Sequence, residues 1–190
     1  MTESRPAPEL PDAEVLLETQ HLRVVRRGTW QYVERRNVHG VVVVVPMTRH
    51  NELVLVEQYR IPVAAHVIEL CAGLADIIDG QPEPLETAAR RELLEETGYQ
   101  ADRLEHLFAG PPSPGISNEI LTFYYAPDVK RVAAGGGTDA DEDIHVHTVP
   151  LANIENWLHQ QAVLGKQIDP RVYVAVYVAR LRKTNPPDVS

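Results

Sequence analysis

The chain has 190 residues, of which 44% are hydrophobic, and it carries a formal net charge of −9 at pH 7. This composition suits one globular domain with a substantial core, and the acidic balance argues against nucleic acid as a partner. No apolar run is long enough to span a membrane, the first residues do not resemble a secretory signal, and the single cysteine, Cys71, excludes an internal disulfide. We therefore expect a cytoplasmic protein with neither nucleic-acid nor membrane partners.

The first part of the chain is expected to begin in disorder and to continue as strands. Residues 1–13 are polar and rich in proline, a composition that disfavours a packed core. Residues 14–38 contain short runs of alternating apolar positions, which predict a small antiparallel strand unit. Two stretches rich in β-branched residues follow, at 40–46 and 52–60, and predict two strands separated by a turn.

The clearest helix in the sequence extends from Pro84 to Gly98. Proline suits the first helical position, and glycine suits the residue just past the end. Further strands and helices are expected later in the chain, the strands at 120–126 and 144–150 and the helices at 153–163 and 170–182. Strands mixed with few helices, without regular βαβ alternation, indicate an α+β chain.

Three carboxylates crowd the C-terminal part of the predicted helix. Glu92, Glu95 and Glu96 fall within roughly a third of the helical circumference, a sector that also holds apolar and small residues. Glu92 and Glu96 are like charges at i,i+4, an arrangement that destabilises a helix. One interpretation is a surface helix in which Arg91 pairs with Glu95. The other is a site for Mg²⁺ or Mn²⁺, which prefer carboxylate oxygen ligands, and spacing alone does not decide between them.

The segment around these acids resembles the signature of the Nudix hydrolase family. That signature is a glycine, five residues, Glu, seven residues, Arg-Glu, an aliphatic residue, any residue, Glu-Glu, any residue and Gly. The matching positions are Glu83, Arg91, Glu92, Leu93, Glu95, Glu96 and Gly98. The front departs from the pattern, because the glycine position is Ile77 and the nearest equivalent, Gly73, comes four residues too early. We interpret the difference as a loop insertion before the helix.

The resemblance implies the Nudix fold, an α/β/α sandwich around a mixed β-sheet, over residues 39–183, with a tail at 184–190. It also implies metal-dependent hydrolysis of a nucleoside diphosphate linked to another group. On this basis Glu92, Glu95 and Glu96 would be catalytic metal ligands, with Mg²⁺ or Mn²⁺ as the cofactor. The carbonyl group of Ala72 would complete the metal site, and Arg91 would orient the acids.

Features outside the signature resemble the ADP-ribose pyrophosphatase branch of that family. They are "VEQYR", which ends at Arg60, "ELCAG", which begins at Glu69, and "SPGISNE", which begins at Ser113. The residues that the resemblance assigns to substrate binding are Arg60, Glu69, Ser113, Gly115 and Glu119. It implies hydrolysis of ADP-ribose to AMP and ribose 5-phosphate, and a homodimer joined through residues 14–38. GDP-mannose or another nucleotide sugar is the alternative substrate, and a non-catalytic domain that senses ADP-ribose is the alternative of a different class.

An acidic run after three successive glycines is a second place for a catalytic carboxylate. The glycines predict a very mobile loop. Glu142 aligns best with an acid of the branch and is expected to be a metal ligand or general base. The other acids of this run are Asp139, Asp141 and Asp143. Asp139 or Asp141 are alternatives to Glu142, and a solvated loop is the usual role of such charge runs.

Several aromatic, histidine and cysteine side chains have more than one interpretation. Trp30 shares a strand face with Tyr32, and either stacking on an adenine or ordinary interface packing would explain it. His145 and His147 alternate on a predicted strand, where a hydrogen-bonded structural role is favoured over a metal site. Cys71 is expected to be a buried hydrophobic residue rather than a nucleophile.

Overall fold

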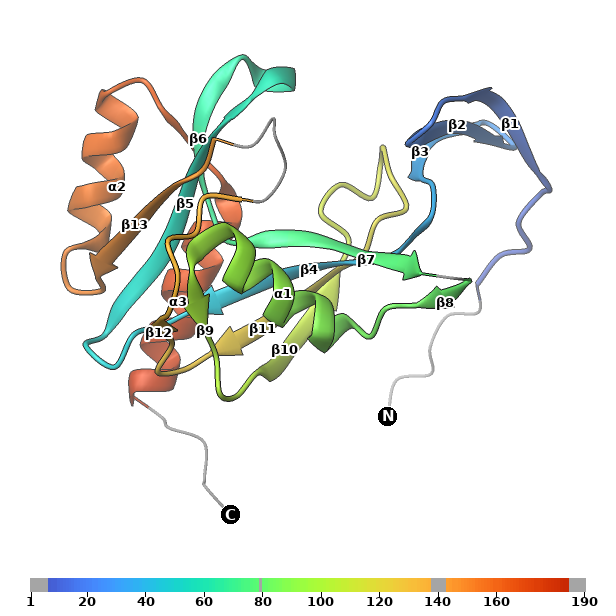
Figure 1. Ribbon diagram of the computed structural model, residues 1–190. Helices are drawn as coiled ribbons and strands as arrows, with labels where there is room; N and C mark the ends of the chain where they lie inside the picture. Colours follow the sequence, from blue (N-terminus) through green and yellow to red (C-terminus); the bar gives the residue numbers. More distant parts are fainter. Residues whose placement is uncertain (1–6, 79, 138–142, 185–190) are drawn as a thin grey trace, which may run out of the picture.

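The computed structural model describes residues 7–78, 80–137 and 143–184 (Figure 1). Three of the predicted features therefore lie partly or wholly outside the described residues. They are the beginning of the segment 1–13, all but the first residue of the tail 184–190, and the acids Asp139, Asp141 and Glu142.

The N-terminal unit is a three-stranded antiparallel sheet, as the alternating pattern predicted. Its strands are β1 (Ala13–Glu18), β2 (Leu22–Arg27) and β3 (Trp30–Arg35), in the order β1-β2-β3. Figure 1 shows this unit, in blue, standing away from the body of the molecule beside the loop that joins β10 and β11. The Val33 N–H donates to the Ile116 carbonyl at 2.8 Å, so the unit is hydrogen-bonded to that loop.

The body contains two mixed sheets, which confirms the predicted mixed α+β architecture. The first has the order β10 (Glu105–Gly110), β11 (Leu121–Ala126), β4 (Val38–Pro46), β7 (Ala72–Ile78), β8 (Gln81–Pro82). The second has the order β13 (His145–Pro150), β5 (Glu52–Arg60), β6 (Ala65–Glu69), β14 (Gln167–Ile168). Strand β11 pairs with β4 in parallel, and β14 pairs with β6 in parallel. Two short elements, β9 (Tyr99–Gln100) and β12 (Lys130–Arg131), pair with each other, and η1 (Ile61–Val63) joins β5 to β6.

The helices match the sequence prediction closely. They are α1 (Leu85–Thr97), α2 (Ile154–Val163) and α3 (Pro170–Thr184). Pro84 lies just before α1 rather than within it, and Gly98 ends the helix in a left-handed conformation with φ 72°. Within the described residues, no helix combines the length and the apolar character that crossing a bilayer requires.

The valine run of β4 is buried on both of its faces from Val42 to Val45. Val42 and Val44 belong to the apolar cluster beneath α1, whereas Val43 and Val45 belong to the cluster formed with α2 and α3. Successive side chains of a strand point to opposite faces, so a strand covered on both sides needs a continuous apolar run rather than an alternating one. This is the α/β/α layering that places α1 over the sheet.

The residues that interrupt the signature form a hairpin. Strand β7 continues as far as Ile78 and pairs with β8 through Ile77↔Pro82 and Ile78↔Gln81. The extra residues therefore lengthen β7 away from α1, and Gly73 stays beside the helix. The insertion, which the sequence predicted as a loop, thus begins as an extension of β7 that pairs with β8.

Leu93 offers a direct test of the packing between α1 and the sheet. Its side chain is fully buried, whereas the neighbouring Leu94 is 40% exposed. We expect Leu93→Ala to lower the free energy of unfolding by about 2–5 kcal/mol, because it removes buried methyl groups and leaves a cavity. Leu94→Ala is the matched control and should cost about 1 kcal/mol or less. Urea denaturation of both variants would measure the difference, and equal losses would contradict the described packing.

Candidate active site

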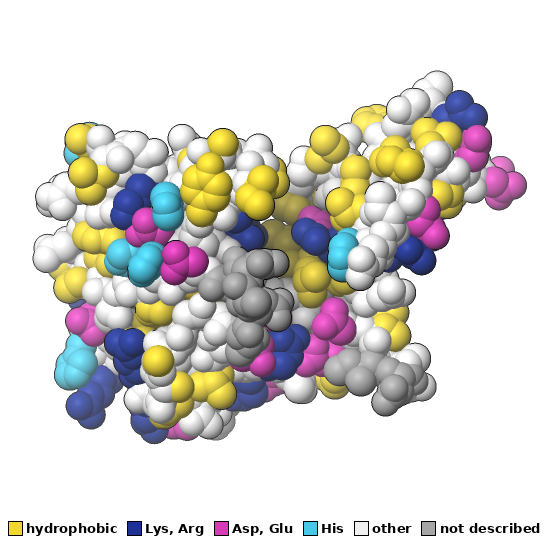
Figure 2. Space-filling view, turned by 45° about the horizontal axis from the view of Figure 1, so that its top comes forward, with side chains coloured by type: hydrophobic (Ala, Val, Ile, Leu, Met, Phe, Trp, Pro, Cys, Tyr) yellow, Lys and Arg dark blue, Asp and Glu magenta, His cyan; other side chains and the backbone are white. Residues whose placement is uncertain are grey.

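A large cavity lies between the N-terminal strand unit and the body of the molecule. Its volume is about 1400 Å³. In Figure 2 a hollow separates the N-terminal unit, at the upper right, from the rest of the surface. The lining comes from strands β3, β4, β5, β6, β7, β10 and β11, from α1, from the loop that joins β10 and β11, and from the start of α3. Elements that are far apart in the sequence therefore meet around one space, and the acidic face of α1 is part of its wall.

The three acids of α1 lie at different depths in this wall. Glu96 is 5% exposed, and its Oε2 accepts a hydrogen bond from the Ala72 N–H at 3.2 Å. The side chain of Glu92 is 15% exposed and that of Glu95 is 31% exposed. All three line the cavity together with Ala72. The structure thus brings together the helix acids and the backbone position that the sequence predicted as one group.

Gly73 is required by the close approach of Glu92. A Cβ at position 73 would lie 1.9 Å from the carboxyl carbon of Glu92 and 2.1 Å from its Oε1. Any other residue would displace the Glu92 side chain from this position. The glycine therefore has a steric role next to the acids, even though it stands four residues earlier than the signature pattern requires.

Arg91 joins the acids to each other and to β7. Its Nη1 donates to Glu92 Oε1 at 2.8 Å and to Glu95 Oε2 at 3.1 Å, while its Nη2 donates to the Leu74 carbonyl at 2.9 Å. Its Nε and Nη2 also donate to the two carboxylate oxygens of Glu83, at 3.2 and 3.0 Å. The predicted pairing of Arg91 with Glu95 is present, as one contact of a larger network.

The ion pair with Arg91 changes the titration of Glu83. Hydrogen bonds from Arg91 lower the pKa of Glu83 despite its burial, and the same carboxylate raises the pKa of Arg91. Glu83 is 7% exposed, and its N–H donates to the Asp76 carbonyl at 2.8 Å. The β7–β8 hairpin therefore leaves Glu83 directly behind Arg91.

The donor set on the cavity wall fits a hard divalent cation in its chemistry. It consists of carboxylates and a nearby backbone segment. In the part of the chain that the structure describes, no group of three or more His, Cys, Asp or Glu side chains is arranged to hold a metal ion. Arg91 and the Ala72 N–H instead engage the carboxylate oxygens.

The glycine run that follows β12 is attached to the end of α1. The Gly136 N–H donates to the Glu96 carbonyl at 2.8 Å, and the Gly137 N–H donates to the Glu95 carbonyl at 3.0 Å. Gly135 has φ 74°, and a Cβ there would lie 2.4 Å from the carbonyl carbon of Thr97. The N–H groups of Gly136 and Gly137 thus cap C-terminal carbonyls of α1, and the high mobility predicted for this loop stays a prediction. The role of Glu142 stays a prediction, since it lies outside the described residues.

The predicted substrate-binding residues are distributed over the cavity and its surroundings. Arg60, Glu69, Ser113 and Glu119 line the cavity, with Arg60 hydrogen-bonded to Glu69 and Glu119 paired with Arg35 of β3. Gly115 belongs to the same loop as Ser113 but is not part of the described lining. Trp30 is 63% exposed on β3 and also lies outside the lining. A binding role remains a prediction for all of the substrate-binding residues named from the sequence, including Gly115 and Trp30.

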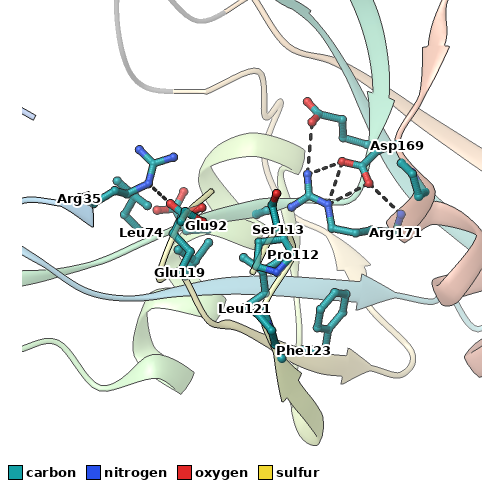
Figure 3. A pocket seen from close by; sticks show the side chains of 18 of the residues that line it. Arg35, Leu74, Glu92, Pro112, Ser113, Glu119, Leu121, Phe123, Asp169 and Arg171 are labelled. Carbon is teal, nitrogen blue, oxygen red and sulfur yellow. Dashed lines mark hydrogen bonds and ion pairs between the residues drawn. The ribbon is translucent and has the colours of Figure 1, made fainter. Parts of the chain in front are cut away.

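The sequence analysis missed four cavity residues that carry charge, one of which is Asp76 on β7. Arg35 lies at the end of β3, and Asp169 and Arg171 lie at the start of α3 (Figure 3). The only sequence signal was the Asp169-Pro170 helix start, which predicts a helix boundary and not a binding role. These residues reach the site through tertiary contacts, which one sequence does not reveal.

The surroundings of His147 and Cys71 indicate structural roles for both side chains, in agreement with their favoured interpretations. The His147 Nε2 lies 2.8 Å from Glu57 Oε2, and the His147 ring packs against Trp157 with centroids 5.0 Å apart. Burial raises the pKa of the Cys71 thiol well above its ordinary value, and the Glu96 carboxylate raises it further. A thiol with a raised pKa is a poor nucleophile.

Comparison with known proteins agrees with this architecture. A family model described as the NUDIX domain matches residues 37–173. The methanol dehydrogenase activator of Bacillus methanolicus is 30% identical over 144 residues, which cover 76% of this chain and 74% of that protein. The GDP-mannose pyrophosphatase of Escherichia coli strain K12 is 35% identical over 122 residues, covering 60% of this chain and 61% of that protein. The crystal structure of an ADP compounds hydrolase superposes with a TM-score of 0.69 at 22% identity, covering 97% of this chain and 99% of that chain.

The family match and the acidic helix that faces the cavity define the class of protein. The chain belongs to the Nudix family and is a Nudix pyrophosphohydrolase. The resemblance inferred from residues 83–98 is therefore confirmed, and the similarity to a GDP-mannose pyrophosphatase supports the nucleotide-sugar branch.

Glu83 gives a test of the network behind the acids. We expect Glu83→Gln to lower the free energy of unfolding at pH 7 by about 1–2 kcal/mol, near the lower end for charged hydrogen bonds, because the Arg91 side chain is 35% exposed to solvent. The folded-state pKa of Glu83 is below its unfolded value of 4.5. Its contribution is therefore present above pH 4.5 and is lost as the pH falls through the folded-state pKa.

The measurement is denaturation in EDTA-containing buffer across the acid range. The difference between wild type and Glu83→Gln should shrink as the pH falls. The control is Glu86→Gln, which removes a pair with Arg90 whose side chains are 54% and 39% exposed and should cost under about 0.5 kcal/mol. A pH-independent difference for Glu83→Gln would contradict the assignment.

Proposed function

We propose that this protein hydrolyses the diphosphate of a nucleoside diphosphate sugar, with ADP-ribose as the preferred substrate and AMP and ribose 5-phosphate as the products. The single observation that supports the proposal most is the cavity of about 1400 Å³, which has the acids of α1 in its wall and arginines at both ends. A small phosphate compound would not fill a cavity of this volume. A nucleotide sugar has a base, two sugars and a diphosphate to accommodate.

The residues of α1 are proposed as ligands of the cofactor. Members of the family generally use a divalent metal ion, and Glu92, Glu95 and Glu96 with the Ala72 carbonyl would hold Mg²⁺ or Mn²⁺. When bound, the ion supplies positive charge against the diphosphate oxygens and makes water easier to deprotonate. Arg91 would position the acids, since its guanidinium group contacts both Glu92 and Glu95.

Other cavity residues are proposed to recognise the substrate. Arg60 offers a guanidinium group to the diphosphate, a geometry that suits paired phosphate oxygens. Phe108 and Phe123 stack with centroids 4.6 Å apart in the cavity lining and give it an apolar surface. Ser113 and Glu119 line the same space and can hydrogen-bond sugar hydroxyl groups.

Segments of the sequence and a named relative both bear on the choice between ADP-ribose and GDP-mannose. ADP-ribose is favoured by the "VEQYR", "ELCAG" and "SPGISNE" segments, whereas the relative at 35% identity is named a GDP-mannose pyrophosphatase.

A homodimer joined through the N-terminal strand unit is also proposed. The exposed apolar side chains of β1, Val15, Leu16 and Leu17, are consistent with such an interface.

The role of Glu96 is tested by Glu96→Gln. We expect this change to reduce kcat by about 10²-fold or more, because it removes a carboxylate charge where the cofactor is proposed to bind. The change is nearly isosteric, so the unfolding transition should remain cooperative. Glu86→Gln, in the exposed first turn of the same helix, is the control and should leave kcat unchanged. A folded Glu96→Gln protein with full activity would count decisively against the proposed metal site.

The substrate is tested with a panel of nucleotide sugars. ADP-ribose, ADP-glucose, GDP-mannose and UDP-glucose would be incubated with Mg²⁺, with Mn²⁺ and with EDTA, and the release of each nucleoside monophosphate would be measured. We expect the highest kcat/KM for ADP-ribose and no turnover in EDTA. A higher kcat/KM for GDP-mannose would move the assignment to the alternative substrate. Binding of ADP-ribose without turnover under any metal condition would support the sensor class instead.

A further inference from the structure

At the end of the cavity formed by α3, two arginines share one buried carboxylate. Arg60 Nε donates to Glu69 Oε2 at 2.7 Å, and Arg171 Nη2 lies 3.5 Å from Glu69 Oε1. Glu69 is 5% exposed, although it lines the cavity. Both of its carboxylate oxygens are therefore already engaged by guanidinium groups. The predicted direct contact between Glu69 and substrate would have to displace one of them.

Arg171 is fixed from behind by Asp169. Arg171 Nε donates to the two carboxylate oxygens of Asp169 at 2.9 and 2.8 Å, and the Arg171 N–H donates to Asp169 Oδ1 at 2.7 Å. The Asp169 N–H in turn donates to the Ile68 carbonyl at 3.0 Å. The start of α3 is thus tied to the strand that carries Glu69. Figure 3 shows Asp169 and Arg171 at the opposite end of the cavity from Arg35 and Glu119.

Both arginines keep terminal guanidinium nitrogens that are available to bind a ligand. Among the described residues, neither terminal nitrogen of Arg60 makes a hydrogen bond, and nor does Nη1 of Arg171. A guanidinium group is permanently charged and has five N–H donors in a planar fork. Both side chains line the cavity and keep part of their surface exposed, 43% for Arg60 and 28% for Arg171.

The charge balance of the cavity makes these donors important. The lining contains seven acids and four arginines. Arg91 is engaged by Glu83, Glu92 and Glu95, and Arg35 is paired with Glu119. A diphosphate entering this acidic space needs cationic groups to offset its own charge. Among the described lining arginines, Arg35, Arg60 and Arg171 keep terminal nitrogens without a hydrogen bond, and of these Arg60 and Arg171 lie together on one carboxylate, where both can face the same diphosphate.

We propose that Arg171 is a substrate-binding residue that acts together with Arg60 on the diphosphate, and that Glu69 is the positioning residue that sets the spacing of the two guanidinium groups. This inference rests on the proposed function. Two neighbouring guanidinium groups repel each other, and a carboxylate between them relieves that repulsion. The competing explanation is that the network only ties α3 to β6, in which case it contributes to stability and not to substrate affinity.

Steady-state kinetics of Arg171→Gln separates these explanations. We expect KM for ADP-ribose to rise about tenfold or more, as for the loss of one charged hydrogen-bonding contact, with kcat within about threefold of wild type. Competitive inhibition by ADP should weaken by a similar factor, whereas inhibition by adenosine, which has no phosphate, should not change. Arg180→Gln is the matched control. Arg180 lies on the same helix, pairs with Glu155 on the surface and is outside the cavity lining, so all parameters should stay at the wild-type values.

Glu69→Gln tests the positioning role. It should raise KM for ADP-ribose and weaken inhibition by ADP, and the double variant with Arg171→Gln should lose less than the product of the two single effects, because both act on one contact. A purely structural carboxylate would change the melting temperature and leave KM and the ADP inhibition constant unchanged. If Arg171→Gln does not fold, Arg171→Lys takes its place, because lysine keeps the charge without the planar fork. This variant is expected to raise KM for ADP-ribose and to weaken inhibition by ADP by a similar factor.

The outcomes that would overturn the inference are distinct from failure of the proposed function. A folded Arg171→Gln protein with wild-type KM and ADP inhibition would overturn it while hydrolysis of ADP-ribose stands. A rise in KM with unchanged ADP inhibition would overturn the assignment to the diphosphate. If wild-type protein instead hydrolyses no nucleotide sugar in the panel, the proposed function itself fails.

Discussion

The arrangement of this site depends on the guanidinium group of Arg91. Three acids within five residues of one helix would repel each other and weaken the helix. Arg91 contacts Glu92 and Glu95 on its own helix, Glu83 before the helix and the Leu74 carbonyl on β7. One cation therefore neutralises part of the acidic cluster and also joins α1 to the sheet. Because Glu83 and Leu74 flank the β7–β8 hairpin, the same network keeps the inserted residues from disturbing the acids.

The sheet beneath α1 gives that network a rigid base. Valines of β4 are buried on both faces, so the strand is enclosed by α1 on one side and by α2 and α3 on the other. Strand β7 pairs with β4 and presents Ala72 and Gly73 beside Glu96 and Glu92. At the far end of α1, the glycines after β12 cap the last carbonyls. The acids are thus held from the sheet, from the hairpin and from the helix terminus, which suits a site that must keep like charges close together.

Much of the fold and half of the site were predictable from local pattern. The helix at 84–98, the valine-rich strand and the N-terminal strand unit follow from periodicity, turn residues and apolar runs, which act over short distances along the chain. The acids of α1 and Arg91 were predictable because a helix brings residues three and four apart to one face. The order of the strands was not predictable, since β4 and β5 are neighbours in sequence and yet lie in different sheets. The caps that the glycine run forms were not predictable either, because glycine permits both free motion and tight caps and only the neighbouring helix end selects between them.

The sequence by itself determined the chemistry of this protein: the spaced acids, the arginine between them and the strands that bury them. Tertiary structure decided which distant residues share the cavity. Arg35, Asp169 and Arg171 come from the first strand unit and the last helix, and no local pattern marks them. It also decided that Glu69 lies between two guanidinium groups. The physical reason is that charge pairing depends on distances in space, and long-range pairing of strands sets those distances only when the chain has folded.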